Sequence, residues 1–105
     1  MIKPALLDIV ELIVDLPKHN LRSGDRGTII ELHTDTVYEV EFSNAYGETL
    51  VFTSLATKQF IVVWKSETQS WVSMSDRITS MIESLPENRQ EEVLRFARSL
   101  YQLPA

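Results

Sequence analysis

The sequence predicts a mainly β fold with α structure at the C-terminus: a five-stranded antiparallel barrel over residues 1–72 and an amphipathic helical hairpin over residues 73–105. Two observations lead to this prediction. Apolar and polar residues alternate at period two through much of the first two thirds of the chain, as half-buried strands require. After a polar stretch at residues 65–70 the apolar period lengthens to about 3.6, which is typical of amphipathic helices.

The first predicted strand places alternate apolar residues on one face: Val10, Leu12, Val14 and Leu16. A helix over residues 5–16 is the competing interpretation, because three carboxylates also recur there at helical spacing. Pro17 and the β-branched residues favour the strand. Whether the segment begins as helix or strand stays open.

Four more strands are predicted at short intervals. Gly24-Asp25 indicates a turn, since glycine adopts positive φ without strain, and a strand over residues 28–33 follows it. Tyr38, Val40 and Phe42 then alternate with glutamates and give the clearest strand signal in the chain. The last two strands are expected at residues 48–55 and 60–64. Five short strands joined by tight turns predict a closed, SH3-like barrel, because closure protects the edges of a sheet.

The helical tail begins where Ser73 and Asp76 have the spacing of a capping box. Ser84-Leu85-Pro86-Glu87 starts a second helix, with proline in its first turn, that runs to about Tyr101. Apolar stripes on both helices must be covered, by the barrel, by a second copy or by another protein. We expect the tail to bind a partner through eight residues: Ile78, Met81, Ile82, Val93, Leu94, Phe96, Leu100 and Tyr101.

Composition and motifs indicate binding and not catalysis. The 105 residues contain no cysteine, which excludes thiol nucleophiles and cysteine zinc sites. His19 and His33 are the only imidazoles, too few for a zinc site, so we expect no metal and no cofactor. The chain lacks a Gly-x-Ser-x-Gly elbow, and residues 24–27 are too short for a phosphate-binding loop. We therefore predict that the protein is not an enzyme and has no catalytic residues.

Charge and hydropathy reduce the number of candidate partners and cellular locations. Residues 1–72 hold six Lys and Arg against ten Asp and Glu, and residues 73–105 hold four against five, for a net charge of -5. Affinity for nucleic acid depends on neutralising phosphates, so an acidic chain disfavours it. No apolar run reaches the ~20 residues of a membrane span, and the N-terminus does not resemble a signal peptide. We expect a cytoplasmic protein with a protein partner.

Several motifs of the first part of the chain occur together: Leu6-Leu7-Asp8-Ile9-Val10, Asp15-Leu16-Pro17, Gly24-Asp25 with Gly27-Thr28-Ile29, and Tyr38-Glu39-Val40-Glu41-Phe42. With these motifs, residues 5 to about 64 resemble a bacterial SH3-like domain-of-unknown-function family, number four-nine-two-six. The resemblance implies a fold and no assigned activity.

The tail contains Leu85-Pro86-Glu87 and Glu92-Val93-Leu94-Arg95-Phe96. It resembles a second family, number two-two-eight-one, whose members are often viewed as antitoxin-like accessory proteins. This resemblance implies a non-enzymatic protein-binding module, the antitoxin-like or accessory subunit of a bacterial toxin-antitoxin-style pair. One alternative is an accessory subunit that docks on a larger complex through the barrel. Another is a KOW-like nucleic-acid binder, because the Gly-Asp turn before a strand resembles the start of ribosomal barrels. A homodimer through the hairpin is a further option.

Overall fold

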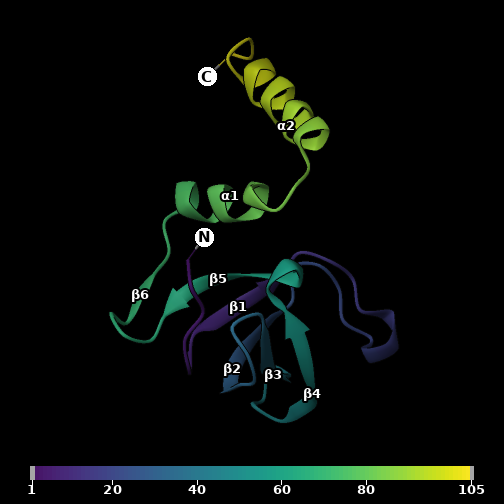
Figure 1. Cartoon of the computed structure of the whole chain (residues 1–105), viewed down its shortest axis with the longest axis vertical. Coiled ribbons are helices and arrows are strands. Elements are labelled where there is room, and N and C mark those ends of the chain that lie inside the picture. Colours follow the sequence, from purple (N-terminus) through teal and green to yellow (C-terminus); the bar gives the residue numbers. More distant parts are fainter. Residues whose placement is uncertain (1, 105) are drawn as a thin grey trace.

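The computed structural model describes residues 2–104, which form one antiparallel sheet followed by two helices (Figure 1). The strands are β1 (Ile9–Leu12), β2 (Arg26–Leu32), β3 (Val37–Ser43), β4 (Thr49–Ala56), β5 (Phe60–Lys65) and β6 (Ser70–Trp71). They are hydrogen-bonded in the order β4-β3-β2-β1-β5-β6. Short 3-10 turns, η1 (Pro17–His19) and η2 (Thr57–Gln59), precede β2 and β5. The helices are α1 (Met74–Glu83) and α2 (Glu87–Leu100).

The antiparallel arrangement and four of the five predicted strands are confirmed, with bounds that differ by no more than two residues from β2, β3, β4 and β5. The prediction of a closed SH3-like barrel is wrong. β4 and β6 stand at opposite ends of the strand order and do not pair with each other. β6 pairs with β5 over only two positions, and the chain then turns into α1. Among residues 2–104, no strand is therefore left to close the sheet onto β4.

The ends of two segments also differ from expectation. The favoured interpretation of residues 5–16, a strand and not a helix, is confirmed by β1, but β1 stops at Leu12, so Val14 lies beyond the strand and is exposed. β6 was not predicted at all, because two residues are too few to show a period. Gln69, which has a φ of 51°, precedes it in a tight turn after β5.

The main core cluster takes alternate residues from most strands: Val10, Leu12, Ile29, Tyr38, Val40, Phe42, Leu55, Phe60 and Val62. In β5 the intervening Ile61 and Val63 are buried as well, so this strand is covered on both faces. The rings of Tyr38 and Phe60 meet edge to face, with their centroids 5.9 Å apart. The Tyr38 hydroxyl donates to the carbonyl oxygen of Asp35 at 3.1 Å. Burial, helped by the nearby Asp35 carboxylate, raises the pKa of Tyr38. Tyr38 is thus a neutral, hydrogen-bonded core residue.

Gly27 allows β2 and β3 to approach each other closely within this core. A Cβ at Gly27 would lie 2.6 Å from Val40 Cγ1 and 2.9 Å from the carbonyl oxygen of Glu41. Atoms in a close-packed interior do not approach so closely without displacement of the backbone. The close approach therefore requires glycine at this position.

The start of α1 is fixed by a local cap and by contacts with Trp71 of the sheet. Ser73 caps the helix, its Oγ accepting from the backbone N–H of Asp76 at 3.2 Å, as the sequence predicts. Two guanidinium groups lie near the ring of Trp71 in β6, with Arg26 at 5.2 Å and Arg77 at 5.9 Å from the ring centroid. These cation–π contacts connect β2, β6 and the first turn of α1.

The tail forms two helices, as predicted, but α2 does not fold back along α1. α1 packs against β5, whereas α2 extends away from the sheet (Figure 1). The division into domains at residues 1–72 and 73–105 stays a prediction. It would separate α1 from the sheet against which α1 packs.

Asp8 ties the N-terminal arm to the turn after β5. Its side chain is fully buried, and Oδ2 accepts from Lys65 Nζ at 2.6 Å and from the Ala5 N–H at 2.9 Å. Oδ1 accepts from the backbone N–H and the hydroxyl of Ser66, at 2.8 and 3.0 Å. Burial alone would raise the pKa of Asp8, but the hydrogen bonds from Lys65, Ser66 and Ala5 outweigh it and lower the pKa below its ordinary value.

Gly27→Ala tests the close approach of β2 and β3. We expect the free energy of unfolding to fall by about 1–3 kcal/mol, since the added methyl group must displace Val40 and the backbone of Glu41. Urea unfolding measures the change. Ser43→Ala, at an exposed strand end, is the control and should differ from the wild type by less than about 0.5 kcal/mol. A Gly27→Ala variant as stable as the wild type would contradict the packing.

Asp8→Asn tests the buried carboxylate. At about pH 7 we expect the free energy of unfolding to fall by about 2–4 kcal/mol, because the amide removes the charge opposite Lys65 and replaces an acceptor with a donor. Urea unfolding again gives the value, and Glu67→Gln in the same turn is the exposed control.

The pH dependence of this difference follows from the pKa of Asp8, which is lower in the folded than in the unfolded chain. The ionised carboxylate therefore stabilises the fold above its ordinary pKa, and this contribution is lost as the pH falls through the folded pKa. The gap between wild type and Asp8→Asn should shrink below about pH 4. A gap that stays constant down to about pH 2 would refute the ionised state of Asp8.

Candidate functional site

The described residues contain no group of three or more His, Asp or Glu side chains placed to hold a metal ion. Within residues 2–104, neither helix has the length and apolar character needed to cross a membrane. The absence of enzymatic activity, metal, cofactor and nucleic-acid binding stays a prediction, as does the cytoplasmic location.

Glu39 forms the best-defined carboxylate network on the outer face of the sheet. Its Oε2 lies 2.9 Å from His33 Nε2 and accepts from the Ser54 hydroxyl at 2.8 Å. The hydrogen bonds from His33 and Ser54 lower the pKa of Glu39 and outweigh the small effect of burial. A general acid needs a raised pKa in an apolar pocket, so this network does not resemble a catalytic site. The Asp8 carboxylate is fully occupied by its structural partners.

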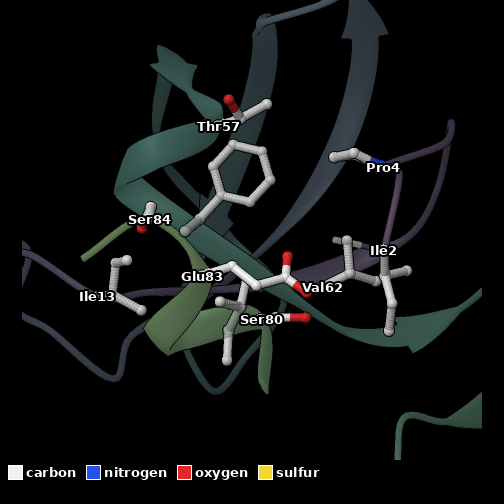
Figure 2. Close-up of a pocket in the computed structure, with 10 residues that line it drawn as sticks. Ile2, Pro4, Ile13, Thr57, Val62, Ser80, Glu83 and Ser84 are labelled. Carbon is white, nitrogen blue, oxygen red and sulfur yellow. The ribbon is translucent and has the colours of Figure 1, made fainter. Parts of the chain in front are cut away.

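A small cavity lies between α1, β5 and the N-terminal arm (Figure 2). Its volume is about 40 Å³, enough for one or a few water molecules but not for a metabolite. Ile2, Ile13 and Val62 form apolar parts of its wall, and Ser80, Glu83 and Ser84 approach from α1 and its end. We interpret this cavity as a gap in the packing beneath α1.

A larger groove of about 480 Å³ lies between α1 and α2. Its lining comprises Ile78 and Ile82 from α1, and Glu87, Gln90, Glu91, Val93, Leu94 and Ala97 from α2. The groove therefore has an apolar floor and two carboxylates on its wall. The groove lies away from the sheet.

The joint between the helices holds this groove open. Pro86 has an extended backbone, with φ -65° and ψ 159°, and α2 starts directly after it. The side-chain amide of Gln90 donates to the carbonyl oxygens of Ile82 and Leu85, both at 3.1 Å. The Ile82 carbonyl also accepts from the backbone N–H of Leu85 at 3.0 Å, so the Gln90 amide adds a further donor there and supplies one to the Leu85 carbonyl, beyond the last helical hydrogen bonds of α1. The two bonds from Gln90 also fasten the first turn of α2 to the end of α1.

The eight residues predicted to bind a partner fall into three places. Ile78, Ile82, Val93 and Leu94 line the groove together. Met81 lies elsewhere on α1, in a shallow hollow with Ile13, Val14, Lys58 and Leu85, and so is not part of this surface. Phe96, Leu100 and Tyr101 lie further along α2 and are 67%, 51% and 88% exposed. Whether any of the eight binds a partner stays a prediction.

Phe96 and Leu100 form a second apolar surface on α2. They are four residues apart, so they lie one above the other on the helix. Neither lines the groove, and no residue of α2 is buried. The apolar part of α2 thus has a groove side and an outer stripe, defined here as Phe96 and Leu100.

The sequence analysis missed the polar part of the groove. The predicted partner-binding residues did not include Glu87 and Glu91, although their spacing of four residues places them on one side of α2. Ala97 was also omitted from the predicted site, although it follows Val93 by four residues and therefore lies on the same side. Helical spacing was the signal available for all three.

Comparison with known families gives one finding for this chain. A family model described as "Domain of unknown function (DUF4926)" matches residues 6–62, more than half of the chain, from the N-terminal arm into β5. Both helices lie outside these residues, so the resemblance of the tail to a second family stays a prediction. Comparison with curated proteins and with solved structures found no match. The chain belongs to the family of the DUF4926 domain.

Proposed function

We propose that this protein is a non-enzymatic protein-binding module that holds a different protein on α2. In this proposal it is the antitoxin-like or accessory subunit of a bacterial toxin-antitoxin-style pair. The observation that carries the proposal is the outer stripe of Phe96 and Leu100, which no part of residues 2–104 covers. Large apolar side chains gathered on one exposed face are typical of interaction sites.

The energetics of α2 support a partner. The helix has 14 residues, and isolated helices of about that length are marginal in water. Most helices in proteins are stabilised by packing of their apolar face, yet α2 has no buried residue. A partner that covers the outer stripe would supply the missing packing.

The chemistry of the stripe favours a groove on another protein. An amphipathic helix binds such a groove through apolar residues spaced by three, four and seven positions. Phe96 and Leu100 have this spacing, and aromatic residues are frequent anchors at interfaces. Arg89 and Glu92 form a salt bridge of 2.8 Å on the exposed surface of the same helix. An exposed pair of this kind adds little to the stability of the helix.

The open sheet gives a second candidate, docking of the protein on a larger complex through β4. β4 is an edge strand of eight residues, and it exposes Leu50 and Phe52 by 61% and 53%. An exposed edge can pair with a strand of another protein. This candidate predicts that Phe52 matters for binding and that Phe96 does not.

Purification from the native host tests the proposal. We expect a stoichiometric second protein that arrests growth when expressed alone and is neutralised by the full-length chain. Phe96→Ala with Leu100→Ala should weaken the complex by at least about 100-fold, because each buried apolar side chain contributes about 1.5–3 kcal/mol.

Two variants serve as comparisons. Asn88→Ala, a change of an exposed polar residue on α2, should bind like the wild type. Loss of binding in Phe52→Ala alone would favour docking through β4. Recovery of only the free chain, or unchanged binding by the double variant, would count against the proposal.

A further inference from the structure

We propose that the groove between α1 and α2 is occupied by α2 of a second copy of this chain, antiparallel to the first, so that each copy fills the groove of the other. This inference goes beyond the proposed function and does not depend on it. The outer stripe does not line the groove and stays available for a different protein.

The groove requires an occupant that is apolar in the middle and basic at one side. Val93, Leu94 and Ala97 form its α2 wall, with Ile78 and Ile82 opposite them on α1. Glu87 and Glu91 add two carboxylates to the wall. Neither of these carboxylates forms an ion pair with another of the described residues 2–104.

The charges of α2 are divided along its length. The three acidic residues, Glu87, Glu91 and Glu92, lie in its first half, whereas its last half carries Arg95 and Arg98 and no acid. Neither of these two arginines forms an ion pair within the described part of the chain. The last half of α2 is therefore the basic, amphipathic segment that the groove requires.

The spacing of these charges fixes the orientation. Glu87 and Glu91 are four residues apart, Arg95 follows Glu91 by four, and Arg98 follows it by seven, so all four lie towards one side of the helix. In an antiparallel pair related by a two-fold axis, that side of one helix faces the same side of the other. Each acidic half then meets a basic half, whereas a parallel pair would bring acid against acid.

The occupant must be a second copy. The last half of α2 cannot fold back to fill the groove of its own chain, because it is the straight continuation of the helix whose residues up to Ala97 form the groove wall. In the antiparallel pair, Val93 and Leu94 lie near the two-fold axis. Tyr101, which follows Ala97 by four residues and is 88% exposed, extends towards Ile78 and Ile82 of the other copy.

The mass of the full-length protein in solution tests this inference. At low salt and high protein concentration, sedimentation should give a mass of twice the 12.1 kDa of one chain. The fraction of dimer should fall when the protein is diluted or when salt is added. Two charge-reversal variants should each weaken dimerisation at least about tenfold: Glu87→Lys with Glu91→Lys, and Arg95→Glu with Arg98→Glu. An equimolar mixture of the two variants should restore a 1:1 dimer, and circular dichroism checks that each remains folded.

Single cysteines test the orientation, since the natural chain has none. Leu94→Cys, near the two-fold axis, should form an intermolecular disulfide under mild oxidation. Tyr101→Cys should not, because the antiparallel pair holds the two copies of this residue far apart. A wild-type chain that stays monomeric at every concentration, a mixture that does not restore the dimer, or efficient crosslinking of Tyr101→Cys would overturn the inference. Phe96→Ala should leave the dimer intact.

Discussion

The position of the tail depends on one buried charge. Asp8 lies fully within the protein and accepts hydrogen bonds from Ala5, Lys65 and Ser66. These contacts join the N-terminal arm to the turn that separates β5 from β6. β6 leads directly into α1, and α1 in turn supports the start of α2. The carboxylate thus anchors the segment from which both helices emerge.

The two helices have unequal roles because only one of them is supported by the sheet. α1 packs on β5, and Trp71 with its two arginines holds its first turn. α2 lacks such support, and its apolar residues form two surfaces. One is a groove with acidic walls, and the other is an outer stripe. This separation would allow self-association and binding of a different protein on the same helix.

Secondary structure was predicted most reliably where a segment was long enough to show a strand or helix period. The alternation at residues 38–42 gave β3, and the capping residue Ser73 gave the start of α1. Closure of the barrel was predicted wrongly, because pairing of distant edges leaves no local pattern. Asp8 was counted among solvent-facing carboxylates of a possible helix. Its main partner, Lys65, is 57 residues away, so no local pattern identifies it as buried.

Within the candidate site, the helical stripe correctly grouped Ile78, Ile82, Val93 and Leu94 around one groove. The stripe also included Met81, which the structure places on another side of α1. A spacing of three or four residues defines a broad arc, and only the direction of the neighbouring helix decides which part of the arc faces the groove. That direction is set by the joint at Pro86, which has no periodic signal.

Because α2 is attached to α1 near Gln90, a small rotation at this joint moves the far end of α2 by several ångströms. The two side-chain bonds of Gln90 to the end of α1 act at one end of a helix about 21 Å long, at 1.5 Å for each of 14 residues. A tilt of about 10° at this pivot moves the far end by about 4 Å, somewhat less than the 5.4 Å pitch of an α-helix. The amide of Gln90 therefore helps to set the direction in which α2 carries its two arginines and Tyr101, and Gln90 itself also lines the groove.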